Sequence, residues 1–96
     1  MAVRHADAIE ALRRAVLDGP GALPPETRRA IFGGAPPDDL AAYLEKVERH
    51  AYRVTDGDVQ TLTALGRSDD ELFEATVSAA LGAGLRRLAA GLATLR

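Results

Sequence analysis

Few side chains in this 96-residue sequence have the types and spacing that catalysis or metal binding needs. His5 and His50 are the only histidines, and neither has a second histidine or an acid at metal-ligand spacing. The chain contains no cysteine, which removes disulfides, thiolate nucleophiles and cysteine-based metal sites together. No serine stands in a nucleophile-elbow pattern, and no glycine-rich loop follows a strand. From these residues we expect neither a metal site nor a cofactor site.

Several other polar and aromatic residues have structural explanations. His50 falls near the end of a predicted helix, where a cation interacts favourably with the free carbonyl groups. Tyr43 and Tyr52 fit core or interface aromatics better than catalytic acids. Glu45 stands four residues before Arg49, which is the favourable order for an ion pair along one helix face. None of these residues requires a ligand to explain its place.

Apolar spacing predicts three helices in the first half of the chain. The first covers Ala2 to Leu17, and the Gly-Pro pair that follows ends it, because proline cannot continue a helix. The second starts at a Pro-Pro-Glu sequence and covers Thr27 to Phe32. The third opens at Asp38 and Asp39 and carries one apolar stripe. That stripe consists of Leu40, Tyr43, Leu44, Val47 and Ala51.

Two further helices have their own start signals. Thr55 precedes Asp58 by three residues, and Ser68 precedes Glu71 by three, which is the spacing of the capping box. Gly66 supplies the helix end between them, and the last helix is predicted from Asp69 to about Leu95. No alternating strand pattern appears. The sequence therefore predicts an all-α fold of about five helices in one domain, residues 1–96.

Charge argues against a nucleic-acid partner. Helix, glycine turn and helix follow one another in this half of the chain, as in a helix-turn-helix DNA reader. The residues that such a protein would offer to DNA are here Asp69, Asp70, Glu71 and Glu74, which repel phosphate. The formal net charge is -2, without clustered Lys and Arg. We expect no nucleic-acid partner.

Hydropathy argues against a membrane segment. The longest uncharged stretch, Ala75 to Leu85, is far shorter than the roughly 20 residues of a transmembrane helix. The opening MAVRHADAIEALRR has a charge every few residues and lacks the apolar region of a signal peptide. We therefore expect a cytoplasmic protein without a membrane partner.

The last helix is rich in small residues. Gly82 and Gly84 each cost a helix up to about 1 kcal/mol relative to alanine, so close approach of another helix is the expected gain. That second helix could belong to the same chain or to another subunit. The short chain and the wide apolar face of the helix favour a subunit interface. The predicted interface residues are Phe73, Val77, Ala80, Leu81, Gly84, Leu85 and Leu88.

The second half of the chain resembles the alkylhydroperoxidase D-like and carboxymuconolactone decarboxylase superfamily. The matching elements, between Leu40 and Leu92, are Glu45-Lys46-Val47, Val54-Thr55-Asp56, Asp58-Val59, Leu62, Leu65-Gly66, Ser68-Asp69-Asp70-Glu71-Leu72 and Arg87-Leu88-Ala89. The Gly-Ala-Leu-Pro-Pro and Arg28-Arg29 segment resembles the family's opening helix more weakly. The resemblance implies a small all-helical oligomer, formed with itself or with a related protein.

The departure from the family concerns its chemistry. Redox members act through a CxxC pair, a following histidine and an upstream glutamate, in helices for which this chain has no room before Glu45. Thiol peroxidase activity is therefore excluded. The carboxymuconolactone type of activity needs no thiol, and His50, Glu45 and Arg87 are its candidate acid-base groups here. Two hypotheses stand: a non-catalytic oligomerisation or accessory module, or a small thiol-independent lyase or isomerase with a pocket between subunits.

Overall fold

The fold is all-helical over the part of the chain that the structure describes. The computed structural model describes the backbone of residues 2–95 and the side chains of residues 5–95. Its elements are α1 (Ala2–Asp18), α2 (Pro25–Phe32), α3 (Asp38–His50), the 3-10 turn η1 (Ala51–Arg53), α4 (Asp56–Ala64) and α5 (Asp69–Thr94). The predicted all-α class with five α-helices is confirmed for residues 2–95.

The predicted start signals of the last two helices work as capping boxes. Thr55 Oγ1 accepts from the Asp58 amide at 3.2 Å, while the Asp58 carboxylate accepts from the Thr55 amide at 2.9 Å. Ser68 and Glu71 repeat the exchange at 3.1 and 2.9 Å. Each box pairs two backbone amide donors that the helix itself leaves free with side-chain oxygens. Gly66 ends α4 in the left-handed region, with φ of +105°, as its glycine predicts.

The third helix ends one residue earlier than its apolar stripe predicts. Leu40 and Leu44 are buried and Tyr43 and Val47 are half-buried, as predicted, whereas Ala51 is exposed. The α-helix ends at His50, whose φ and ψ of -143° and 51° turn the chain into η1 and rotate Ala51 off the stripe. The placement of Ala51 on the stripe was therefore wrong.

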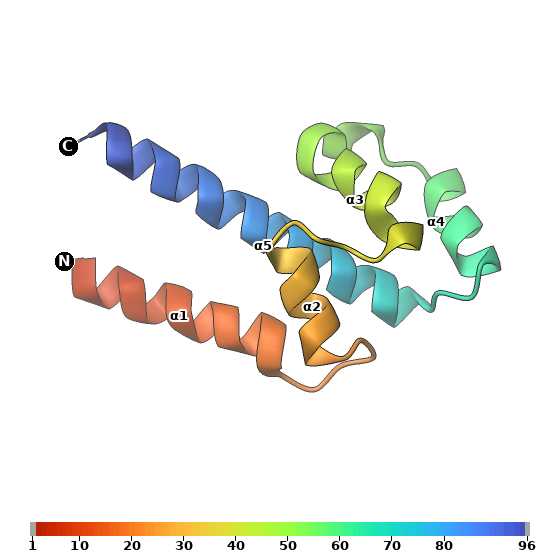
Figure 1. The fold of residues 1–96 in the computed structure, drawn as a ribbon, viewed down its shortest axis with the longest axis horizontal. Helices are drawn as coiled ribbons and strands as arrows, with labels where there is room; N and C mark the ends of the chain where they lie inside the picture. Colours follow the sequence, from red (N-terminus) through yellow and green to blue (C-terminus); the bar gives the residue numbers. More distant parts are fainter. Residues whose placement is uncertain (1, 96) are drawn as a thin grey trace.

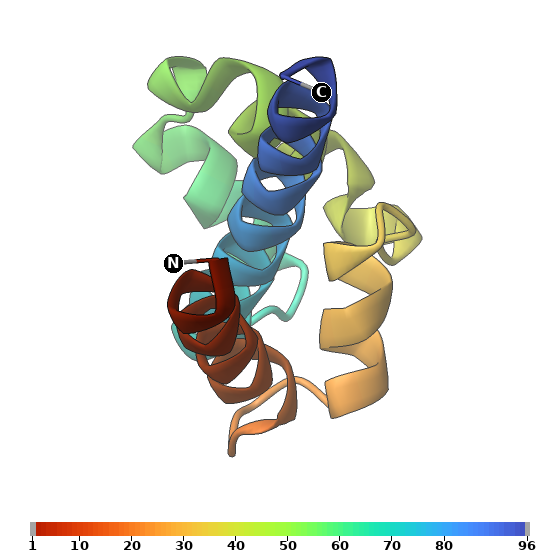
Figure 2. The ribbon, with the colours of Figure 1, turned by 90° about the vertical axis from the view of Figure 1, so that its left-hand side faces the viewer.

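The core lies where the short helices meet the first half of α5. Figures 1 and 2 show α5 running through the middle of the molecule, in contact with α1, α2 and α3. The α4 helix packs on α3. Buried residues of the core are Leu23, Ile31, Leu40, Leu44, Leu62, Leu72, Ala75 and Ala79. Tyr43 of α3 and Val59 of α4 pack against them.

Two helix ends project beyond this core. The first turns of α1 and the last turns of α5 extend toward the same end of the molecule, where both termini lie (Figure 1). The radius of gyration is 14.4 Å, against about 12.5 Å for a folded domain of this length. None of the helices within residues 2–95 has the length and apolarity that crossing a membrane requires.

Candidate functional site

The buried face of α5 is made of small residues. Apart from Leu72, its buried residues are Ala75, Ser78, Ala79, Gly82 and Ala83. At Gly82 the end of α2 lies so close that a methyl group would come within 3.0 Å of the Phe32 carbonyl carbon. The small residues predicted a close approach by another helix, and a second subunit was favoured as its source. At Gly82 the approaching helix is α2 of the same chain. Only the absence of a side chain allows α2 to cross here.

The predicted interface residues lie on the remaining surface of the same helix. Phe73 is 69% exposed and Leu88 45% exposed, and Ala80 and Gly84 are also exposed. The other three, Val77, Leu81 and Leu85, are half-buried. In contrast to Gly82, a methyl group on Gly84 would meet nothing within 4 Å. At Gly84, therefore, no described residue of the same chain covers this face. That a partner covers it stays a prediction.

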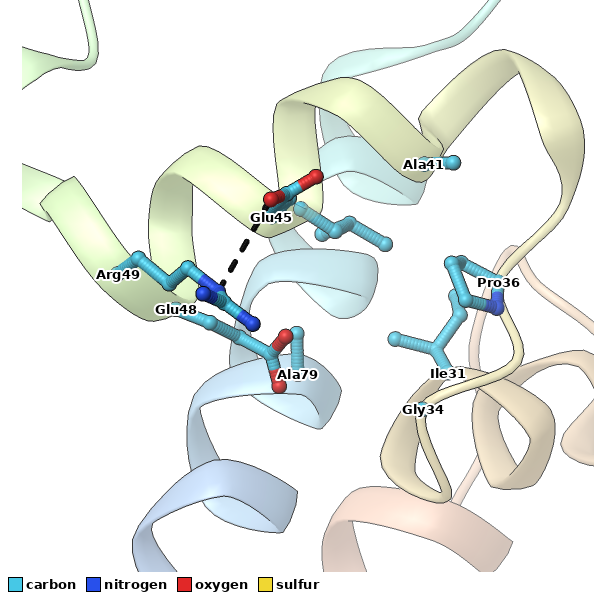
Figure 3. Close-up of a pocket in the computed structure, with 9 residues that line it drawn as sticks. Ile31, Gly34, Pro36, Ala41, Glu45, Glu48, Arg49 and Ala79 are labelled. Atoms are coloured by element: carbon cyan, nitrogen blue, oxygen red, sulfur yellow. Dashed lines mark ion pairs between the residues drawn. The ribbon is translucent and has the colours of Figure 1, made fainter.

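The three candidate acid-base residues do not share one cavity. Glu45 lines a cleft of about 330 Å³ together with Glu48 and Arg49, over Ala79 of α5 (Figure 3). Arg87 lines a neighbouring hollow, which Glu45 does not reach. His50 lines neither of these two cavities.

Each candidate also has a neighbour that explains its position. His50 packs edge-to-face on Tyr52, with ring centroids 6.0 Å apart. Glu45 pairs with Arg49 at 3.9 Å, as the four-residue spacing predicts. Arg87 donates to the Glu48 carbonyl oxygen at 2.9 Å. The site residues predicted for a lyase therefore serve local contacts in the single chain. Tyr52 is 79% exposed, so of the two structural interpretations the core one was wrong, and an interface role stays a prediction.

Two arginines hydrogen-bond α5 to α2 and α3 at the point where α5 leaves the core. Arg86 donates to the Phe32 carbonyl oxygen and to the Glu48 carboxylate, both at 2.7 Å. Arg87 reaches the end of α3 from the next position. Both cations are thereby directed toward α2 and α3.

A bidentate ion pair joins α3 to the start of α5. Arg67 donates to both carboxylate oxygens of Asp39, at 2.7 and 2.9 Å, and to Glu71 at 3.1 Å. The hydrogen bonds from Arg67 hold the pKa of Asp39 below its ordinary value. The Ser68 amide, and then Arg67, lower the pKa of Glu71. These acids are structural, which agrees with the explanation of Glu71 as helix-start chemistry.

The cap of α4 is also tied to α3 by an ion pair. Lys46 donates to both oxygens of Asp58, at 3.0 and 3.1 Å. The amide of Thr55 and the ammonium of Lys46 lower the pKa of Asp58. Lys46 and Asp58 both belong to the segments that resemble the alkylhydroperoxidase D-like pattern. In this chain they position one short helix against another.

Sequence reasoning missed a buried arginine in α2. Arg28 is only 3% exposed and donates to three carbonyl oxygens, those of Val16, Gly19 and Leu23. It thereby supplies hydrogen-bond donors to free backbone carbonyl groups at the end of α1 and in the loop that follows. Its position three residues before Ile31, on the buried side of a short helix, is the signal that could have revealed it.

Glu74 holds the same loop from the side of α5. Its carboxylate accepts from the amides of Ala22 at 2.7 Å and Leu23 at 2.9 Å. The two contacts join the α1–α2 connection to the second turn of α5. This turn lies near the N-terminus of α5, far from its projecting C-terminal end. Glu74 was predicted only as a charge that repels DNA, and its structural role could not be inferred from local spacing, since the partners lie 51 and 52 residues away.

These features define an all-α domain with a buried small-residue face and an exposed apolar face on one long helix. Comparison with family models, with curated proteins and with solved structures finds no match to this chain. The resemblance to the alkylhydroperoxidase D-like superfamily stays a prediction.

Proposed function

We propose that this chain is a non-catalytic helical oligomerisation or accessory module, of the alkylhydroperoxidase D-like kind, whose interface is the exposed apolar face of α5. The observation that carries the proposal is the distribution of residue size on α5. Apart from Leu72, the residues that α5 buries are small, whereas Phe73, Leu88, Leu92 and Leu95 are exposed. Large apolar side chains gathered on one exposed face are typical of protein–protein contact sites.

The total surface supports the proposal. The single chain exposes 6513 Å², against about 5,300 Å² for a folded monomer of this mass. The excess of roughly 1,200 Å² exceeds the roughly 800 Å² that one partner contributes to a stable interface. An assembly would bring the exposed area of each chain back to the ordinary range.

The arrangement of the polar candidates also favours a module over an enzyme. General acid-base catalysis needs two or more groups around one substrate position. Glu45 and Arg87 line different cavities, and His50 contacts an exposed tyrosine. One observation keeps the lyase or isomerase as a second candidate: the cleft at Glu45 and Glu48 has a ligand-sized volume, and a subunit contact could close it.

Replacing Gly84 by leucine tests the interface. A leucine side chain on the approach face would hold a partner away, so the assembly should fall to the mass of a single chain in sedimentation or light scattering. Ala90→Leu is the matched control, because Ala90 is exposed on the same helix about 120° around the axis from Gly84. An unchanged mass for Gly84→Leu would remove the interface. His50→Ala should leave assembly and stability unchanged, and the loss of an activity in that variant would favour the enzyme.

A further inference from the structure

The projecting end of α5 carries a leucine repeat. Leu81, Leu85, Leu88, Leu92 and Leu95 follow one another at intervals of four, three, four and three residues. At 100° per residue these five positions fall within an arc of about 80°. The interval pattern is that of the paired a and d positions of a helix that packs against another helix. We call these five leucines the distal seam.

The distal seam lies on a part of α5 that its own chain barely covers. Leu85 is half-buried, and every residue from Arg86 to Leu95 is exposed. Leu92 is 51% exposed and Leu95 82% exposed. About three turns of helix therefore lie beyond the core, and an isolated helix of that length is marginal in water. Packing against a second helix would supply the tertiary contacts that stabilise these turns.

The lack of charge beside the distal seam bears on the identity of this second helix. Between Leu81 and Leu95 the positions that flank the seam are Gly82, Gly84, Ala89 and Gly91, none of which is charged. Charged flanking residues normally select a different partner or reject an identical one. Arg86 and Arg87 are held toward α2 and α3 by their hydrogen bonds, so they do not oppose self-pairing. Small flanking residues allow two helices to approach closely.

The order of the leucines sets a register. Leu88 is midway between Leu81 and Leu95, and Leu85 and Leu92 lie within one residue of the same symmetry. An antiparallel pair centred on Leu88 would therefore set Leu88 opposite Leu88 and Leu81 opposite Leu95, with Leu85 and Leu92 offset from each other by one residue. It would also place the two cores at opposite ends of the pair and oppose the two helix dipoles. A two-fold axis of this kind closes the assembly at two chains.

We infer that the distal seam binds the distal seam of a second copy of this chain, antiparallel, with the two Leu88 side chains at the two-fold axis. The inference rests on the proposed interface of α5, and it adds the partner, the segment and the direction. The excess of exposed area is larger than the roughly 800 Å² that one chain contributes to a stable dimer.

The first experiment measures the dissociation constant of the purified full chain by analytical ultracentrifugation. The wild type should be a dimer, and Leu88→Asp should weaken it at least about 100-fold, because both copies lose a buried leucine. Ala90→Asp, on the side of the helix opposite to the seam, should leave the constant unchanged. Leu88 lies outside the core, so all three proteins should keep a folded core. The helix content of Leu88→Asp by circular dichroism should therefore fall by no more than the distal turns, residues 86–95.

The second experiment determines the direction of pairing, and the absence of cysteine makes it clean. Leu88→Cys should form a covalent dimer with a short bismaleimide, whereas Leu95→Cys should not. In the antiparallel pair the two Leu95 positions are about 14 residues, or 21 Å, apart along the axis. Cross-linking of both variants would overturn the antiparallel register.

The outcomes separate the two levels of the argument. A wild type that is a single chain at all concentrations would overturn the dimer and remove self-association from the proposed function. An assembly that Gly84→Leu breaks but Leu88→Asp leaves intact would keep the interface of α5 and overturn the distal seam. Dimers that dissociate with Leu88→Asp and cross-link only through Leu88→Cys support both.

Discussion

Gly82 and Gly84 lie two residues apart in α5, and alanine should stabilise the chain at Gly84 but not at Gly82. A methyl group on Gly82 would lie 3.0 Å from the Phe32 carbonyl carbon and 3.1 Å from its Cα. The Phe32 carbonyl oxygen would lie closer still, well inside contact distance, so α2 would have to retreat by about 1 Å or more. At Gly84 nothing lies within 4 Å of the added methyl group.

The magnitudes follow from two opposing effects. Alanine is favoured over glycine in a helix by about 1 kcal/mol, and this gain is common to both substitutions. Overpacking at Gly82 costs about 1–3 kcal/mol. The retreat would also lengthen the hydrogen bond from Arg86 to the Phe32 carbonyl, now 2.7 Å. We expect Gly84→Ala to raise the free energy of unfolding by about 1 kcal/mol, and Gly82→Ala to lie about 1–3 kcal/mol below Gly84→Ala.

Thermal and urea unfolding measure this difference directly. Both variants should be made in the Leu88→Asp background, so that self-association does not contribute to the measured stability. Each kcal/mol corresponds to roughly 4–8 °C in Tm for a domain of this size. Gly91→Ala is a second control, because its added methyl group also meets nothing within 4 Å. Equal stabilisation by all three substitutions would refute the close crossing of α2 over α5.

Two further predictions concern polar groups. Ser78 is fully buried and its hydroxyl has no hydrogen-bond partner among the described residues, so Ser78→Ala should raise the free energy of unfolding by about 1 kcal/mol in urea; a loss of stability would show that the hydroxyl is paired. The pKa values of Asp39, Asp58 and Glu71 lie below their ordinary values, which are 3.8 for Asp and 4.5 for Glu. These carboxylates therefore stabilise the fold at a pH above the ordinary values, and the contribution should be lost as the pH falls through the lowered pKa values. Glu71→Gln can keep the capping hydrogen bond without titrating, so its stability should fall less steeply between pH 5 and pH 3; identical slopes would contradict the assignment.

The helix boundaries were predictable because the signals that set them are local. Thr55 with Asp58, and Ser68 with Glu71, form their hydrogen bonds within three residues of sequence. Gly66 takes a positive φ for the same local reason. The exception is Ala51, because the backbone turn at His50 is not encoded in apolar spacing.

The contacts between helices were less predictable, since they join residues far apart in sequence. Arg28 binds carbonyl oxygens of α1 and its loop, and Glu74 binds loop amides more than 50 residues away. Sequence also left open whether the small residues of α5 faced the same chain or a partner. The decision depends on where α2 crosses, and α2 crosses at Gly82, two residues from a glycine that meets nothing.

The two glycines show why a small-residue run alone cannot define an interface. If α5 served only its own core, burying leucines would stabilise the chain more, since a leucine contributes about 1.5–3 kcal/mol on burial and an alanine much less. Instead α2 and α3 pack on alanines, a serine and a glycine, while Leu88, Leu92 and Leu95 face outward. The small face lets the short helices approach closely and orients α5. Orientation in turn sets the leucines on the outside, in one line, where a second helix can reach them. The inner face of α5 thus determines the geometry of the outer one, and a substitution at Gly82 should disturb self-association even though Gly82 lies outside the proposed contact.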